Sequence, residues 1–166
     1  KPCTPFQWAR MYSPEDYLGR ARIVNHTMKQ QHNQKSLKYN WHEADLTVLE
    51  GVFARGDRRT CDVLIKAFEK GAKFDGWSEY FNMEIWKEAM EECNLDADFY
   101  VYRERGYDEV LPWDFIDIGV NRKYLERENE KAKRAELTRN CLEGCTGCGI
   151  NVNFKEGKCF EGAIRN

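Results

Sequence analysis

The chain has 166 residues, 42% hydrophobic and 13% aromatic, so it can bury a core and global disorder is excluded. It carries 26 Lys and Arg against 28 Asp and Glu, a net charge of −2 that gives no strong signal for nucleic acid. No apolar run reaches membrane-spanning length, and no signal peptide is visible. The seven cysteines are an odd number, which disfavours a disulfide scaffold. We therefore expect a cytoplasmic protein of one domain, or of one domain and a tail.

The first thirty residues predict an ordered loop followed by a helix. Two X-Pro steps in "KPCTPFQW" hold the chain extended at their first residues. Ser13 then suits a helix N-cap, Pro14 suits the first helical position, and Asp16 completes an S-x-x-D capping box. Apolar residues follow at helical spacing and predict a helix to about Gln31. These residues are Tyr17, Leu18, Ala21, Val24 and Met28.

The middle of the chain predicts a layer of three helices and a few short strands. "LKYNWH" (37–42) and "FIDIGV" (115–120) are the strand candidates, because apolar and polar residues alternate in the second and the first has the composition of a short strand. The three helices are expected at 46–54, 59–70 and 83–93, and a charged, weakly anchored helix is expected at 121–135. The helix from Pro14 is expected to pack on the layer. Its three helices have predicted buried faces made of Leu46, Leu49, Val52 and Phe53; of Cys61, Leu64, Ile65 and Phe68; and of Ile85, Trp86, Ala89, Met90 and Cys93.

These buried faces give the layer a testable core. A charged residue at Leu64 or Trp86 is expected to unfold it, because each would bury an unpaired charge.

The block "ARGDRR" lies between the first two helices and groups Arg55, Arg58 and Arg59 around Asp57. Arginine forks suit a phosphate, the carboxylate of a small molecule or an RNA backbone. The alternative, which the position at a helix junction favours, is a solvated boundary in which Asp57 caps the next helix.

The stretch "NCLEGCTGCGIN" (140–151) holds Cys141, Cys145 and Cys148 at C-x3-C-x2-C spacing, with a glycine directly before each of the last two. Short glycine-containing loops can bring thiolates together around zinc or an iron–sulfur cluster. Cys159, after ten intervening residues, is the candidate fourth ligand, and Cys3 could join only through a tertiary contact. Three thiolates suffice for a cluster if a small molecule holds the fourth iron. The simpler alternative is three unligated cysteines in a tail.

Five blocks, in this order, resemble the C-terminal portion of an uncharacterised subfamily of radical S-adenosylmethionine (SAM) iron–sulfur oxidoreductases with a cobalamin-binding-like N-terminal region. The blocks are "KPCTPFQW", "VFARGDRR", "KFDGWSEYF", "LPWDFIDIGV" and "CTGCG", and the resemblance covers nearly the whole chain. The residue patterns above predict an α+β, mainly helical fold, and the resemblance implies that it begins with the end of a barrel. Residues 1–36 would be the end of a partial (βα) barrel and the first helix, residues 37–135 a helical extension, and residues 136–166 a cysteine-rich metal-binding tail.

The resemblance implies a segment of a radical SAM enzyme that is inactive alone. Only 18 residues follow Cys148, too few for the barrel that follows a primary cluster loop, and the start at Lys1 is expected to be a cut through a longer protein. The implied partner is the missing N-terminal barrel, which would hold SAM and a [4Fe–4S] cluster. No catalytic residue and no substrate is indicated.

The metal site of the tail leaves alternatives open. The expected ligands of an auxiliary iron–sulfur cluster are Cys141, Cys145, Cys148 and Cys159. The subfamily pattern has a further cysteine where this chain has Asn151, so either Cys159 replaces it or the site holds three thiolates. The alternative function is a non-catalytic interaction module with structural zinc at these cysteines.

Overall fold

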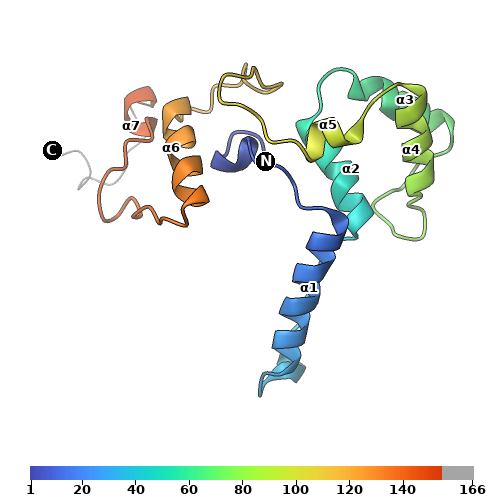
Figure 1. The fold of residues 1–166 in the computed structure, drawn as a ribbon, viewed down its shortest axis with the longest axis horizontal. Helices are drawn as coiled ribbons and strands as arrows, with labels where there is room; N and C mark the ends of the chain where they lie inside the picture. The colour runs from blue at the N-terminus through green and yellow to red at the C-terminus, as the bar shows by residue number, and fades with distance from the viewer. Residues whose placement is uncertain (155–166) are drawn as a thin grey trace. The chain divides into compact units, whose positions relative to one another are not determined.

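The computed structural model describes residues 1–154, without the side chain of Gln34, and is helical (Figure 1). Helix accounts for 48% of it, and no strand occurs in the described range. The predicted α+β class is therefore wrong, and so is the end of a partial (βα) barrel in residues 1–36. Neither 37–42 nor 115–120 forms a strand, because a strand needs a hydrogen-bonded neighbour and no other segment within residues 1–154 supplies one. In 115–120, Asp117 instead accepts the N–H of Gly119 at 2.8 Å and makes a turn.

The described chain divides into two compact units. The first unit contains Lys1–Ala9 and the residues from Arg105 onward, and the second contains Arg10–Glu104. The domain boundaries predicted after residues 36 and 135 stay predictions. No helix in the described residues is both long and apolar enough to cross a bilayer. In chain order the elements are the 3-10 turn η1 (Pro5–Gln7), α1 (Pro14–Lys29), the 3-10 turn η2 (Gln34–Ser36), α2 (Ala44–Arg55), α3 (Thr60–Glu69), α4 (Met83–Glu92), α5 (Ala97–Val101), α6 (Arg122–Lys133) and α7 (Ile150–Asn153).

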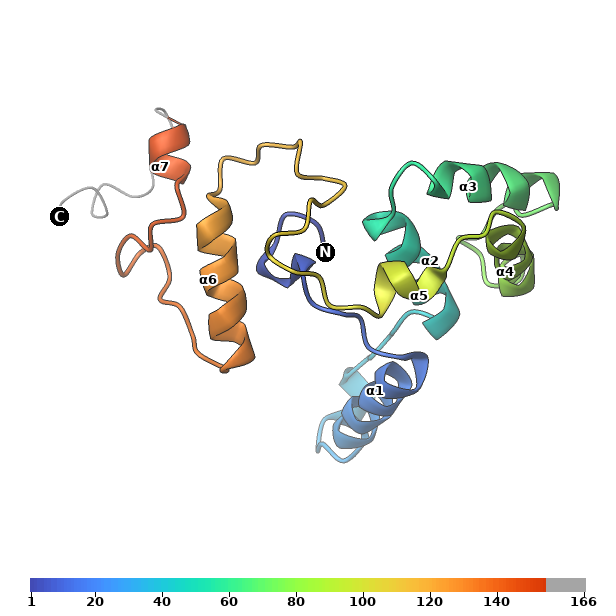
Figure 2. The same ribbon diagram turned by 45° about the horizontal axis from the view of Figure 1, so that its top comes forward.

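Helix α1 begins where the sequence predicts and ends two residues earlier. The Ser13 hydroxyl accepts the backbone N–H of Asp16 at 3.2 Å, which confirms Ser13 as the N-cap. Only Ala21 is buried in this helix, which packs on α2. The following segment runs back alongside α1 in both ribbon views, and the Tyr17 hydroxyl donates to the carbonyl of His42 at 3.2 Å (Figure 2).

Helices α2 to α5 form the core of the second unit. Ala67 of α3 and Ala89 of α4 are both fully buried, and these small side chains let the two helices approach closely. Trp86 is buried, as predicted, and packs edge-on against Phe53 of α2 with ring centroids 5.4 Å apart. The core consists of Leu49, Val63, Ala67, Trp86, Ala89 and Met90, with Val52, Tyr100 and Val101 in a second cluster.

Helix α3 buries a different face from the one its apolar spacing predicts. Val63 is 0% exposed, whereas Leu64 and Phe68 are 51% and 72% exposed. Ile65 and Cys61 of the predicted face are exposed as well. The helix carries apolar residues on both faces, and packing against α4 selects the face with the smaller side chains. The expectation that a charge at Leu64 unfolds the layer is therefore withdrawn, and the one for Trp86 stays a prediction.

The first unit brings the N-terminal block into one core with residues that lie about a hundred positions later. Trp8 is buried with Leu111, Trp113 and Leu125. The side-chain oxygen of buried Gln7 accepts the indole N–H of Trp113 at 2.6 Å and the backbone N–H of Cys3 at 3.1 Å. These contacts fix the N-terminal block on the segment "LPWDF" and on α6, which leads into the cysteine segment.

Candidate metal centre

The cysteine segment is attached to the start of α6 by backbone and side-chain hydrogen bonds. The backbone N–H of Asn121 donates to the carbonyl of Cys148 at 2.8 Å. The hydroxyl of Thr146 lies 3.3 Å from that of Tyr124, and the guanidinium of Arg127 donates to the carbonyl of Thr146. Residues 146–148 are therefore held in place by three contacts to α6 and its N-cap.

Two glycines give this segment its turns. Gly147 has φ of 76° and Gly149 has φ of 102°, in the left-handed region that glycine adopts without strain. At Gly149 a Cβ atom would lie 2.7 Å from the side-chain amide of Asn121. The loop therefore needs glycine at position 149 both for its backbone angle and for its contact with the N-cap of α6.

The thiol of Cys145 accepts two N–H groups. The backbone N–H of Gly147 lies 3.4 Å from its sulfur, and the side-chain amide of Asn151 lies 3.8 Å from it. The Gly147 hydrogen bond is the largest cause of a lowered pKa at Cys145; Asn151 and the nearby Arg139 guanidinium lower the pKa further, against an opposing effect of burial. Hydrogen bonds of this kind stabilise a thiolate, the form of cysteine that binds metals.

The structure describes three of the four predicted metal ligands. Cys141 is exposed, Cys145 and Cys148 are half-buried, and all three are free thiols. In residues 1–154, no three His, Cys, Asp or Glu side chains are grouped so that they could hold a metal ion. Cys159 lies outside the described residues. The donor chemistry of the four-cysteine set fits a thiolate-bound metal, and the set stays a prediction.

Asn151 and Arg139 are residues of this segment that the sequence does not assign to the site. Asn151 stands where the resemblance leads one to expect a further cysteine, and its side-chain amide lies 3.8 Å from the Cys145 sulfur. The absence of the expected cysteine at position 151 is the sequence signal that could have pointed to Asn151. Arg139 donates to the carbonyl of Cys145 at 3.2 Å, and nothing in the sequence around it distinguishes it from the other basic residues near α6.

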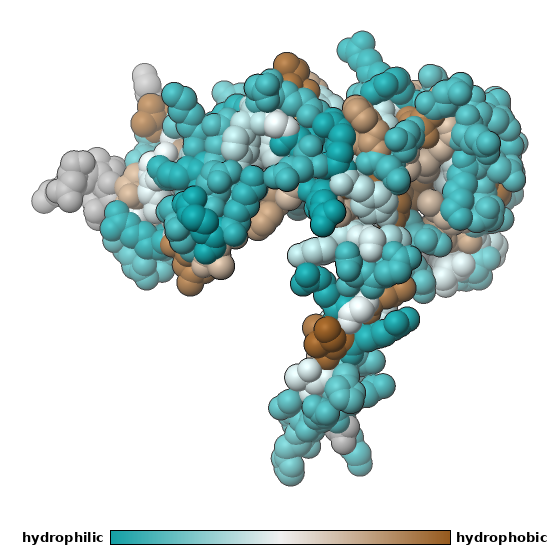
Figure 3. All heavy atoms as spheres, viewed as in Figure 1, coloured by the Kyte–Doolittle hydropathy of each residue, from teal (hydrophilic) through white to brown (hydrophobic). Residues whose placement is uncertain are grey.

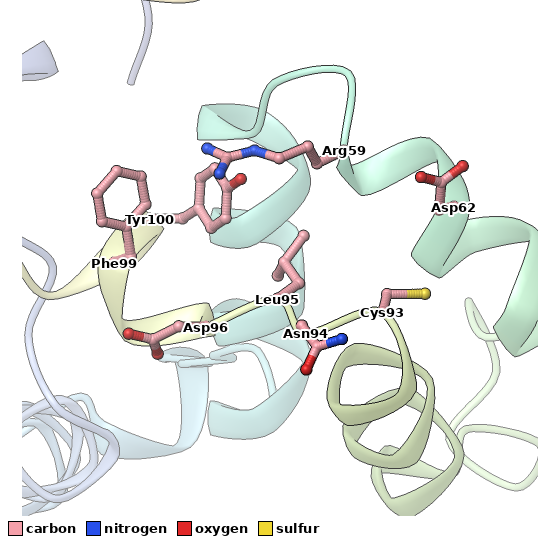
Figure 4. A pocket seen from close by; sticks show the side chains of 8 residues that line it. All are labelled: Arg59, Asp62, Cys93, Asn94, Leu95, Asp96, Phe99 and Tyr100. Atoms are coloured by element: carbon pink, nitrogen blue, oxygen red, sulfur yellow. The ribbon is translucent and has the colours of Figure 1, made fainter.

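The arginines of "ARGDRR" do not form one anion site. Arg55 is buried, and its guanidinium donates to the carbonyl of Val101 at 3.1 Å, which ties α2 to α5. Arg59 instead pairs with Asp57 at 2.6 Å and lines a hollow of about 300 Å³ (Figure 4). In this view the Arg59 guanidinium lies beside the ring of Tyr100, with centroid 5.8 Å away. The hollow is lined by Arg59, Asp62, Cys93, Asn94, Leu95, Asp96, Phe99 and Tyr100.

Asp57 gives the second unit an acid-sensitive contact. The side chain of Arg59 is the main cause that holds the pKa of Asp57 at about 2, against an ordinary 3.8. A carboxyl with a lower pKa in the folded chain stabilises the fold fully above its unfolded pKa and loses this contribution as the pH falls towards the folded one. We expect the urea midpoint of the native chain to fall more steeply between these two pH values than that of Asp57→Asn. Native and Asp57→Asn curves that run parallel would contradict the assignment.

Comparisons with known proteins return no relative. No family model, no curated protein and no solved structure matches this chain.

Proposed function

We propose that this chain is the C-terminal segment of a radical SAM iron–sulfur enzyme, and that its cysteine segment holds an auxiliary iron–sulfur cluster. The observation that carries the proposal is the conformation around Cys145. There a left-handed Gly147 directs its N–H to the cysteine sulfur at 3.4 Å. Cysteine loops that bind iron–sulfur clusters use backbone N–H groups in this way to offset thiolate charge and to set the reduction potential.

The position of the segment also supports the proposal. Three of the five blocks that carry the resemblance, "KPCTPFQW", "LPWDFIDIGV" and "CTGCG", belong to the first unit. Gln7 bonds to Trp113 between the first two blocks, and Asn121, directly after the second, bonds to Cys148 in the third. A cluster on the cysteine segment would therefore sit on a packed core, which restricts solvent and fixes the ligands better than a free tail would.

The proposal leaves the radical chemistry to the preceding part of the enzyme. That part would be this chain's partner and would bind SAM at a [4Fe–4S] cluster; the chain alone would be inactive. We place the protein in the cytoplasm, where thiols stay reduced. The free state of the six cysteines in the described residues, together with the odd total, supports this compartment.

The test is metal analysis with an absorption spectrum on chain purified and reconstituted without oxygen. We expect a brown protein containing iron and sulfide, and we expect Cys145→Ser to lose most of the bound iron. Cys61→Ser is the matched control, because Cys61 is an exposed free thiol on α3, and it should keep the iron of the native chain. A colourless protein with one zinc per chain would instead support the interaction module. Retention of iron by Cys145→Ser would contradict the cluster assignment.

The enzyme assignment has its own measurement. A cluster-loaded full-length protein is expected to cleave SAM reductively and to release deoxyadenosine. The absence of deoxyadenosine from such a preparation would contradict the radical SAM assignment, whatever metal the tail binds.

A further inference from the structure

Residues 20–42 concentrate positive charge in an otherwise acidic chain. This stretch, the basic arm, consists of the later part of α1 and the segment that runs back along it. It holds five of the 26 Lys and Arg, all three His and none of the 28 Asp and Glu. The basic residues are Arg20, Arg22, Lys29, Lys35 and Lys38. The net charge of −2 for the whole chain conceals this separation.

The charges of the basic arm are exposed and not neutralised by the protein. All five Lys and Arg side chains are exposed, and none of them has a carboxylate partner within the described residues. By contrast, Lys66 of α3, Lys70 at its C-cap and Lys87 of α4 all form ion pairs. Figure 3 shows mostly hydrophilic side chains on the visible face of the arm.

One face of the helix aligns part of this charge. Arg22, His26 and Lys29 follow at i, i+4 and i+7, so they lie above one another on α1. The His26 ring is hydrogen-bonded to the side-chain amide of Gln30 at 2.9 Å. The spacing spreads the cations along about two helical turns, a length over which several phosphates of an extended strand can be contacted.

The return segment adds an aromatic platform. The rings of Tyr39 and Trp41 lie 5.3 Å apart with an interplanar angle of 35°, and Trp41 is 42% exposed. Lys38 directly precedes Tyr39 in the sequence and is exposed. An aromatic ring that is half open to solvent and flanked by a cation offers a stacking surface to any unpaired base.

We propose that the basic arm binds single-stranded nucleic acid. Phosphates would lie along Arg22, Lys29 and Lys38, and one base would stack on Trp41. A single strand fits better than a duplex, because its bases are open to stacking whereas those of a duplex are not. Association confined to one arm suits a protein whose remaining surface is acidic and repels phosphate. This inference concerns a surface of the second unit and does not rest on the iron–sulfur assignment.

The experiment is fluorescence anisotropy of a labelled oligouridylate of about 12 nucleotides, within the range of site sizes of single-strand binders. At low salt the native chain should bind with a Kd in the micromolar range, and the affinity should fall with salt. Trp41→Ala should weaken binding about tenfold, the effect of losing one stacked base. Arg22→Gln with Lys29→Gln should also weaken binding and should reduce the salt dependence by about the contribution of two phosphates.

A matched double variant tests whether the loss of affinity comes from the basic arm or from the lower charge of the whole protein. Arg58→Gln with Lys73→Gln removes the same charge from two exposed side chains outside the arm, and it should bind like the native chain. Equal weakening by both double variants would overturn the proposal, as would equal affinity for a polyglutamate of matched charge, which would indicate an acidic protein partner. Tighter binding of a duplex than of either strand would overturn the single-strand assignment. Oligouridylate and oligothymidylate of one length distinguish RNA from DNA, and binding of either supports the proposal. Circular dichroism of each variant establishes that the fold is kept.

Discussion

Val63→Asp is expected to unfold the second unit, whereas Leu64→Asp is expected to leave it folded. The two residues are neighbours in α3, but Val63 is 0% exposed and Leu64 is 51% exposed. A carboxylate at position 63 would be buried among the apolar side chains of Leu49, Trp86 and Met90. That burial costs about 4 kcal/mol or more, which is comparable with the whole stability of many small domains. At position 64 the charge reaches solvent, and the cost is about 1 kcal/mol.

Far-UV circular dichroism during thermal and urea unfolding measures both variants. Val63→Asp should lose a large part of the helical signal before heating, and Leu64→Asp should show a cooperative transition close to that of the native chain. Val63→Ala is the control for volume, since it removes two methyl groups without adding charge, and it should lie between the two. If Leu64→Asp were the more damaging of the pair, the orientation of α3 would be wrong and the face given by the apolar spacing would be the buried one.

Local chemistry in the sequence predicts where helices begin better than which face they bury. Ser13 caps α1 as expected, because a side-chain oxygen next to a free backbone N–H needs no tertiary partner. The face of α3 depends on α4, and α3 has apolar residues on two faces. The four-residue spacing from Leu64 to Phe68 fits burial as well as the spacing from Val63 to Ala67 does. Only packing against Ala89 distinguishes them.

The missing strands have a related cause. Apolar and polar residues do alternate in 115–120. A strand forms, however, only when another segment completes its backbone hydrogen bonds, and whether one does so depends on the tertiary structure. Phe115 and Ile116 are instead exposed at 86% and 50%. A barrel strand was also expected because of the resemblance. The described residues contain no strand, so this expectation is wrong whatever the origin of the resemblance.

For the candidate sites too, the sequence predicts the residue types, and the structure adds the contacts between them. The spacing of Cys141, Cys145 and Cys148 can be recognised in the sequence, because the ability to bind a metal depends on the residue type. The hydrogen bonds from Gly147 and Asn151 to Cys145 depend on the loop conformation, so the sequence does not predict them. The charge of the basic arm could have been found from the sequence by counting charge in windows. It disappears when charge is summed over the chain.

Trp8→Ala is expected to unfold the first unit. The side chain is 1% exposed and packs edge-on against the ring of Tyr107, with centroids 4.8 Å apart, in a core of three other buried side chains. Removing it costs about 3–5 kcal/mol through lost burial and a cavity that the surrounding backbone cannot fill. A unit with so few buried residues has little stability to spare. Because α6 packs on η1, its amides should exchange rapidly in the variant.

Two further substitutions isolate the reason for this effect. Phe6→Ala changes the neighbouring aromatic residue, which is 58% exposed, and should cost about 1 kcal/mol. Trp8→Phe keeps an aromatic ring in the core and removes an indole N–H that has no hydrogen-bond partner in the described part of the chain, so it should be milder than Trp8→Ala. Hydrogen exchange followed by mass spectrometry of peptides from 122–133 measures all three. Since Asn121 at the start of α6 holds Cys148, loss of protection there should also lower the iron binding that we propose for the tail. Full protection of these amides in Trp8→Ala would mean that α6 does not depend on the N-terminal block, and the shared core of the first unit would have to be abandoned.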